Sequence, residues 1–414
     1  MSAAITSTRP RTQLRRREWA LIAAAMACCG WGGNQFTPLL LMYRKLGGYS
    51  EVTVDMFLGA YVVGLAPALL VTGALSDRYG RRPVMVAGTW LSLLSSVVLA
   101  LGADGPIPLY AGRFLAGVAT GVAMAVGSSW VKELSQAPYD PRSDAGAGAR
   151  RASLSLTVGF GVGAGLAGAL AQWGPWPMVL PYLPHVVLTL PVALLLPRRA
   201  ETRPMETDPG TSLLSSLKIP AAAHRRFLRV VLPMAPWIFG SAAVAYAVMP
   251  QVVSARTGTW GLAFATLATV CTLSAGVLVQ PLARRLDSIS TARATVFAMG
   301  LVTAGMVLCA AVAATQSVWL ALAGGIVLGA AYGVAIVSGL LEIQRIAAAR
   351  GNDDLASLTG VYYAVSYTGF LFPSILAALS KLTSYTVLLV AVALIALLCT
   401  LVVQSGSRRH LPSS

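Results

Sequence analysis

Three ionisable side chains stand within long apolar stretches of this chain, and such groups are suited to holding or moving a proton. Arg113 lies inside one stretch, Asp55 about one turn into another, and His185 halfway along a third. A charge in apolar surroundings is costly, so Arg113 should face a wet cavity or a partner. A free imidazole titrates near neutral pH. We therefore predict that Asp55 and His185 take part in proton coupling, and that Arg113 contributes by biasing the protonation of a partner.

Each of the three also has an explanation that involves no proton transfer. Arg113 lies about two turns from the end of its stretch, so its long side chain can reach the membrane surface. His185 lies among prolines, in PYLPHVVLTLP, which free backbone carbonyls for a neutral imidazole to bond. Asp55 can cap a helix end that is exposed to water. The sequence leaves both kinds of explanation open.

Residues 73–82, GALSDRYGRR, combine charges with glycines between two apolar stretches. Glycine allows helix ends to approach and permits a tight reversal. Asp77 can accept from a helix N-terminus or an arginine, and such contacts can form in one conformation and break in another. The pattern predicts a turn that takes part in gating, formed by Gly73, Asp77, Arg78, Gly80, Arg81 and Arg82.

These six positions match the G-x-x-x-D-R-x-G-R-R signature of the major facilitator superfamily. The chain resembles the 12-span drug or metabolite:proton antiporter branch of that family, where the signature forms the cytoplasmic turn between membrane helices 2 and 3. The resemblance implies a secondary transporter that works by alternating access. It also implies an all-α membrane protein with 12 transmembrane helices in two pseudo-symmetric six-helix bundles.

Composition leads to the same class of protein. Hydrophobic residues make up 56% of the chain, charged residues 11%, and the mean hydropathy is +0.70. A membrane-crossing helix needs about 20 mostly apolar residues, and breaks in the sequence leave twelve such stretches: 19–43, 52–75, 84–103, 107–131, 152–172, 178–196, 229–252, 260–282, 293–314, 317–340, 355–379 and 384–404.

The basic residues orient these spans. Twenty-six lie in the tails and in the turns on one side, and four lie on the other: Arg44, Lys45, Arg256 and Lys381. The positive-inside rule then places both termini and the 73–82 turn in the cytoplasm. The net charge of +16 is thus a topology signal, and nucleic-acid binding is excluded because no soluble basic domain exists.

The chain contains an internal duplication. Residues 117–127, GVATGVAMAVG, align with residues 329–339, GAAYGVAIVSG, at an offset of 212. With the resemblance, this predicts a cytoplasmic N-terminal tail, an N-terminal bundle, a cytoplasmic linker, a C-terminal bundle and a cytoplasmic C-terminal tail at 1–18, 19–196, 197–228, 229–404 and 405–414.

Two glycine patterns bear on mechanism. Arg113, Gly117 and Gly121 share one helix face and resemble the span-4 motif of proton-coupled members of the superfamily. GFGVGAGLAG in span 5 resembles the antiporter motif at Gly159, Gly163 and Gly168, although alanine replaces its proline and one glycine. The second pattern favours export, and the alternative is ordinary packing of small residues.

The fold implied by the resemblance places spans 1, 4, 7 and 10 around a substrate cavity. The polar and aromatic residues expected there are Asn34, Gln35, Arg113, Trp237, Tyr246 and Tyr332. The acidic residues lie in loops or near span ends, so the cavity should accept neutral or anionic compounds better than cations.

We therefore expect a proton-coupled exporter of small amphipathic compounds, a drug or metabolite transporter in a bacterial cytoplasmic membrane. The alternative is an uptake symporter for an organic anion, and a non-transporting receptor has little support. We expect no enzymatic activity, no cofactor beyond the proton gradient, no metal, and function as a monomer. The expected partners are a small-molecule substrate, protons and the lipid bilayer. The five cysteines show no metal-ligand spacing.

Overall fold

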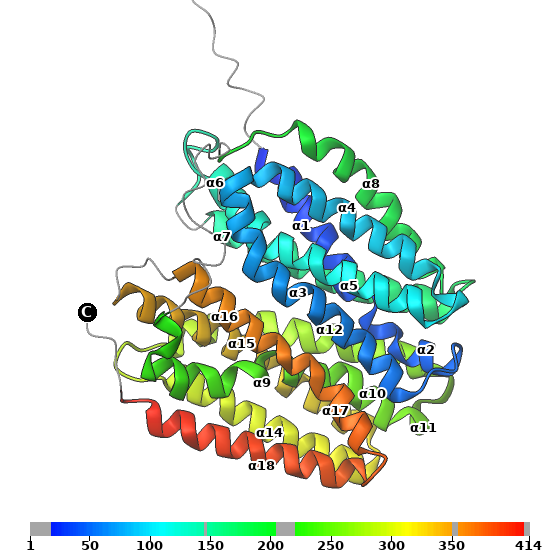
Figure 1. Ribbon diagram of the computed structural model, residues 1–414. Coiled ribbons are helices and arrows are strands. Elements are labelled where there is room, and N and C mark those ends of the chain that lie inside the picture. Colours follow the sequence, from blue (N-terminus) through cyan, green and yellow to red (C-terminus); the bar gives the residue numbers. More distant parts are fainter. Residues whose placement is uncertain (1–17, 145–146, 204–219, 350–354, 410–414) are drawn as a thin grey trace, which may run out of the picture.

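The structure is a computed structural model, and it describes residues 18–144, 147–203, 220–349 and 355–409. Regular structure within these residues is entirely helical (Figure 1). Eleven of the described helical segments are long and apolar enough to cross a membrane. Helix α1 (Glu18–Asn34) has 17 residues, and with the short helix α2 (Leu40–Lys45) it supplies the twelfth crossing of the expected fold.

The spans divide into two halves of six. After α1 and α2, the N-terminal half contains α3 (Glu51–Tyr79), α4 (Arg81–Ala100), α5 (Pro106–Val122), α6 (Ser128–Leu134), α7 (Ala147–Trp173) and α8 (Leu183–Leu195). The C-terminal half contains α9 (Leu232–Ala243), α10 (Met249–Val252), α11 (Ser254–Thr257), α12 (Gly261–Leu278), α13 (Gln280–Leu286), α14 (Arg293–Thr315), α15 (Val318–Ala348), α16 (Leu355–Tyr367), α17 (Phe372–Leu379) and α18 (Tyr385–Gly406).

Helix α1 begins, and helix α18 ends, at the left of Figure 1, the end of the bundle that also carries α6 and the start of α16. The expected tails and linker fall largely on residues 1–17, 204–219 and 410–414, which lie outside the described residues.

Glycine contacts repeat in the two halves at the positions of the sequence duplication. A Cβ atom at Gly117 of α5 would lie 2.0 Å from a carbonyl oxygen of α3, and one at Gly329 of α15 would lie 2.1 Å from a carbonyl oxygen of α12. The next glycine of each helix, Gly121 or Gly333, packs against the following turn of the same neighbour. The two halves therefore share one helix-packing scheme, as pseudo-symmetry requires.

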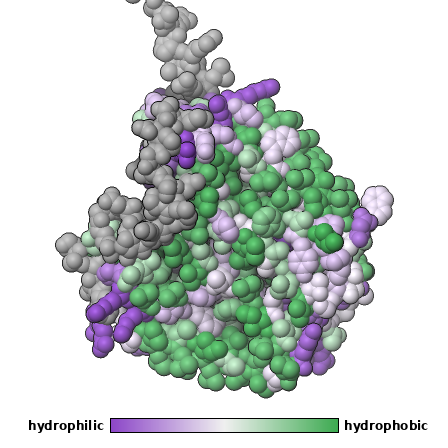
Figure 2. All heavy atoms as spheres, viewed as in Figure 1, coloured by the Kyte–Doolittle hydropathy of each residue, from purple (hydrophilic) through white to green (hydrophobic). Residues whose placement is uncertain are grey.

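Apolar side chains cover much of the outer surface (Figure 2). On α18 the exposed ones recur every three or four residues and form one face: Val387, Val390, Leu394, Leu398 and Leu401. Such a face suits contact with lipid tails. Since lipid is as apolar as these side chains, helix association depends on the close packing of small residues inside the bundle.

Two of the described spans contain a π-helical turn in their middle, at Ala123–Gly127 between α5 and α6 and at Val244–Val248 between α9 and α10, and a third π-turn, Phe227–Val231, precedes α9. A π-turn places an extra residue in the helix and is frequent at functional sites. The turn at Val244–Val248 contains Tyr246, which faces the space between the two halves.

Candidate functional site

A small cavity lies between the two halves. Half of the residues that line it are aromatic, and its walls include Asn34, Tyr61, Arg113, Phe239, Tyr246, Tyr332, Tyr367 and Phe370. Its volume is about 40 Å³, whereas sites for small organic compounds measure about 300–1,000 Å³. The aromatic side chains must therefore separate before a substrate can enter.

Three aromatic rings of the C-terminal half form a flat wall. Phe239 stacks on Tyr367 with ring centroids 4.0 Å apart and on Phe370 at 5.2 Å. Phe370 also meets Tyr61 of the N-terminal half edge to face at 6.1 Å. Flat, stacked rings offer a surface for planar organic groups.

Arg113 supplies the charge of this cavity, and its side chain is 1% exposed. Its Nη1 donates to the Gly33 carbonyl oxygen at 2.9 Å and its Nε to that of Phe57 at 3.4 Å. Its Cζ lies 4.3 Å from the ring centroid of Tyr61 and 4.9 Å from that of Phe36. Carbonyls and ring faces stabilise a cation in part, yet within the described residues no carboxylate pairs with it.

The structure shows how the charge of Arg113 is accommodated. Its burial does not fit a side chain that reaches the membrane surface. Asp55, an acid that could offset this charge, bonds instead to Gln251 of α10, whose Nε2 donates to Asp55 Oδ1 at 3.3 Å. The guanidinium keeps a positive charge at the cavity without an ion pair in the described part of the chain.

The expected cavity residues split into two groups. Asn34, Tyr246 and Tyr332 line the cavity with Arg113. Asn34 donates through Nδ2 to the Phe160 carbonyl at 3.0 Å, and its Oδ1 accepts from Thr37 at 2.7 Å.

Gln35 and Trp237 do not line this cavity. Gln35 follows Asn34 directly, and on a helix two successive side chains cannot share a face. It turns toward α4, where its Nε2 donates to Ser96 Oγ at 2.7 Å. Trp237 packs edge to face on Phe372 with ring centroids 5.3 Å apart. The hypothesis that both belong to the cavity does not fit this arrangement.

His185 is fully buried within the N-terminal half, with both ring nitrogens near polar partners. Nε2 lies 2.9 Å from the Cys28 carbonyl oxygen, and Nδ1 lies 2.8 Å from Ser96 Oγ. Because a carbonyl can only accept, Nε2 carries the hydrogen and Nδ1 accepts from the serine hydroxyl. This arrangement is that of the alternative explanation, a neutral histidine bonded to a backbone carbonyl.

The turn between α3 and α4 is held by ion pairs. Gly80 has a φ of +95°, a left-handed conformation that favours glycine. Arg81 Nη1 lies 2.8 Å from Asp77 Oδ1, and Arg81 Nη2 lies 3.0 Å from Glu133 Oε1 of α6. Asp77 also pairs with Arg203 at 3.3 Å.

Glu201, and not Asp77, accepts from the helix N-terminus at the start of α4. Its Oε1 accepts from the Arg81 backbone N–H and its Oε2 from that of Arg82, both at 2.9 Å. The Arg82 side chain donates to the Arg199 carbonyl oxygen at 3.2 Å. The remaining signature residues differ: the Arg78 guanidinium lies 5.5 Å from the Tyr79 ring centroid, and Gly73 has open space at its Cβ position.

Sequence reasoning missed Glu133 and Glu201 because they lie 52 and 120 residues from Arg81. Their acidic character was the one available sign. In the expected topology, both acids lie near the ends of apolar stretches and close to basic turns, where ion pairs can form.

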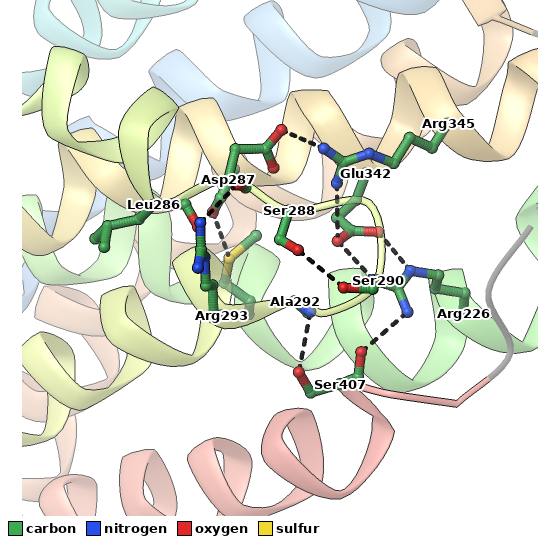
Figure 3. Close-up of polar contacts among 12 residues, drawn as sticks. Arg226, Leu286, Asp287, Ser288, Ser290, Ala292, Arg293, Glu342, Arg345 and Ser407 are labelled. Atoms are coloured by element: carbon green, nitrogen blue, oxygen red, sulfur yellow. Dashed lines mark hydrogen bonds and ion pairs between the residues drawn. The ribbon is translucent and has the colours of Figure 1, made fainter.

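The C-terminal half has its own network at the corresponding turn, between α13 and α14 (Figure 3). Arg345 of α15 pairs with Asp287, and it lies 3.4 Å from Glu342. Glu342 binds Arg226 through two contacts of 2.5 and 2.8 Å, and both side chains are buried. At the repeat offset of 212, Arg345 aligns with Glu133, so the two halves place opposite charges at equivalent positions.

The glycines of α7 face two different neighbours. A Cβ atom at Gly159 would lie 2.1 Å from the Ala27 carbonyl oxygen, and one at Gly163 would lie 2.7 Å from that of Trp31, both in α1. At Gly168 it would lie 1.9 Å from Thr266 Oγ1 of α12. The motif thus packs α7 closely both on its own half and on the opposite half.

Twelve helical spans in two similar halves, with an aromatic, arginine-containing cavity between them, define the architecture of a membrane carrier. The model of the family described as Major Facilitator Superfamily matches residues 20–369. The chain therefore belongs to this superfamily of transporters, and it is not an enzyme.

Curated relatives match one short segment. Multidrug resistance protein MdtL of Citrobacter koseri is 33% identical over 72 residues, and that of Escherichia coli is 38% identical over 72 residues. Each match covers 17% of this chain and 18% of the relative. A solved structure, "a POT family transporter in complex with 5-aminolevulinic acid", shares the fold with a TM-score of 0.74 and 13% identity, over 95% of this chain and 96% of that one.

Proposed function

We propose that this chain is a secondary active transporter that exports small amphipathic neutral or anionic compounds by proton-coupled alternating access. One observation carries the proposal, namely the buried guanidinium of Arg113 at a cavity between the two halves. A buried cation without an ion pair attracts an anionic or strongly hydrogen-bonding group. The stacked rings opposite favour a planar organic body.

Export is supported by two features of this chain. The relatives that match part of it carry the name multidrug resistance protein. Gly168 of α7, in the pattern that resembles the antiporter motif, lies in close contact with α12 of the other half. An uptake symporter for an organic anion is the second candidate, and the positive charge of Arg113 favours it equally.

The remaining parts of the proposal concern setting and coupling. We place the protein in a bacterial cytoplasmic membrane as a monomer, with both termini and the 73–82 turn in the cytoplasm. The five domain segments expected from the sequence belong to the proposal too. Among the proton-coupling candidates, Asp55 is hydrogen-bonded to a residue of the other half, and Arg113 lines the cavity between the halves. The hydrogen bonds of His185 stay within one half.

Transport assays in proteoliposomes with an imposed pH gradient test this function. We expect counterflow of protons and of aromatic compounds that are neutral or anionic, with little movement of matched cations. Co-directional movement of proton and anion would establish the symporter instead. Movement that ignores the pH gradient, or a preference for cations, would overturn the proposal.

A further inference from the structure

At one contact between the halves, two buried acceptor atoms are unpaired within the part of the chain that the structure describes. Asp55 of α3 is 1% exposed and Gln251 of α10 is 7% exposed. Gln251 Nε2 donates to Asp55 Oδ1 at 3.3 Å, a long hydrogen bond. Asp55 Oδ2 and Gln251 Oε1 are buried and have no partner among the described residues. In an ionised carboxylate and an amide, both of these oxygens can only accept.

A proton on Asp55 makes its carboxyl group chemically complementary to the amide of Gln251. A carboxylic acid donates through its O–H and accepts through its other oxygen, and an amide does the reverse through its oxygen and its N–H. We propose that Asp55 and Gln251 form a proton-binding site that closes this end of the transporter when Asp55 is protonated. The inference rests on the alternating access proposed above.

An ionised Asp55 has little to stabilise it in this place. The charged and titratable groups that face it are Arg44 of α2, Glu51 of its own helix and Tyr385 of α18. Arg44 is ion-paired with Glu51, and Tyr385 donates to Glu51 Oε2 at 2.9 Å. These groups are therefore engaged with one another, and an ionised Asp55 would be a buried charge with one long hydrogen bond.

Asp55 and Gln251 lie at an end of the transporter where hydrogen bonds join the two halves. Four other hydrogen bonds in the described part of the chain join the halves at this end: Lys45 Nζ to Gly258 O, Gln172 Nε2 to Thr259 O, Ala263 N to Gln172 Oε1, and Tyr385 Oη to Glu51 Oε2. This is the end opposite the 73–82 turn. Separation of the halves here exposes Asp55 to water, where a carboxylate is well solvated.

The sign of the pH effect follows from this difference. The closed form binds the proton more tightly than the open form, so acid favours closure and closure is lost as the pH rises. For a single proton, the ratio of closed to open molecules changes by at most about tenfold per pH unit.

Distance measurement between spin labels tests the site without any substrate. Labels on cysteines placed at Leu46 and Leu382, which are 61% and 83% exposed, report the gap between the halves at this end. Cys271 and Cys399 are half-buried and are replaced by serine, while the other three native cysteines are buried. We expect the long-distance population of the otherwise native protein to grow as the pH rises.

Two variants and a matched control distinguish the contribution of Asp55 from that of Gln251. Asp55→Asn cannot ionise and should stay closed at every pH. Gln251→Leu should require a lower pH for closure, with the same steepness. The control Gln172→Leu loses two bonds between the halves but no acid, so it should open more at every pH and keep the pH response.

A pH response that survives in Asp55→Asn would overturn the site, and an unchanged midpoint in Gln251→Leu would remove Gln251 from it. Failure of these distance measurements leaves proton-driven transport in proteoliposomes untouched. Absence of transport in that assay equally leaves the distance result standing, so the two proposals fail separately.

Discussion

Arg113 and Arg226 show two ways of burying a guanidinium in this protein. Arg226 has no exposed surface and meets the carboxylate of Glu342 with two nitrogens, a geometry that satisfies both charges. Arg113 is as deeply buried, but carbonyls and ring faces surround it and no carboxylate of the described residues pairs with it. Because an uncompensated buried charge is costly, we infer that Arg113 is retained for binding or coupling and Arg226 for structure.

Substitutions at Arg113 should separate coupling from folding. We expect Arg113→Ala to lower transport driven by a pH gradient by about tenfold or more while substrate exchange without a gradient persists. Arg113→Lys should be partly defective, since lysine keeps the charge but not the planar fork that reaches two carbonyls. Normal gradient-driven transport by a well-expressed Arg113→Gln protein would contradict the coupling role and direct attention to His185.

Breaking the other pair should affect stability above all. Glu342→Gln leaves the buried charge of Arg226 without its carboxylate, and we expect a loss of about 3–5 kcal/mol in the free energy of unfolding. The double variant Arg226→Met with Glu342→Leu removes both charges and should recover most of that loss. Thermal unfolding in detergent measures both, with Asp144→Asn at an exposed ion pair as the control. Equal destabilisation by the single and double variants would mean that packing, not charge, is at stake.

Among the elements, sequence patterns predicted the spans well and the polar contacts poorly. Hydropathy and the glycine repeat identify the spans, because both are local properties that lipid and close packing impose on the chain. The six-residue signature predicted a tight turn at Gly80, and the turn has the φ of +95° that requires glycine. Its partners Glu133 and Glu201 come from distant segments, and no local pattern encodes such a meeting.

The cavity shows the same division. Asn34 lines it and Gln35 does not, although both are amides at the same depth, because one residue along a helix changes the face by about 100°. The π-turn that carries Tyr246 and the hydrogen bond that Gln251 donates to Asp55 were both missed. The sequence gives one sign of the Gln251 contact, namely a polar residue in the last turn of an apolar span.

The turn between α3 and α4 should act in the conformational cycle. Asp77 pairs with Arg81 and Arg203, and its side chain is 46% exposed. Exposed ion pairs contribute little to stability, so Asp77→Asn should fold normally. We expect it to reduce transport by about tenfold or more, because the charge-assisted contacts bias one conformation. Asp144→Asn is again the control for an exposed acid. Wild-type turnover in Asp77→Asn would leave the turn as a marker of topology alone.

At the scale of the whole molecule, the two halves have the same packing but different electrostatics. Glycines at the repeat offset pack their helices in the same way. The charges do not repeat, since Glu133 of one half corresponds to Arg345 of the other and the signature turn has only a degraded counterpart. Packing is set by the duplicated framework, so it repeats. Polar contacts are free to diverge, and each turn has acquired its own network.

Orientation in the membrane is the property of the whole molecule that charge should decide. Positively charged loops stay in the cytoplasm, and 26 of the 31 basic residues lie on the side of the termini. We expect a membrane-impermeant maleimide to label a cysteine placed at Ala255 in intact cells, and to label a cysteine placed at Ser2 only in inside-out membrane vesicles. Ala255 is exposed and helical, unlike nearby Gly258, whose φ of +51° disfavours a side chain. The same chain without the added cysteines is the control for background labelling. Labelling of both positions from one side would reject the topology, and with it the assignment of the Asp55 end to the outside of the cell.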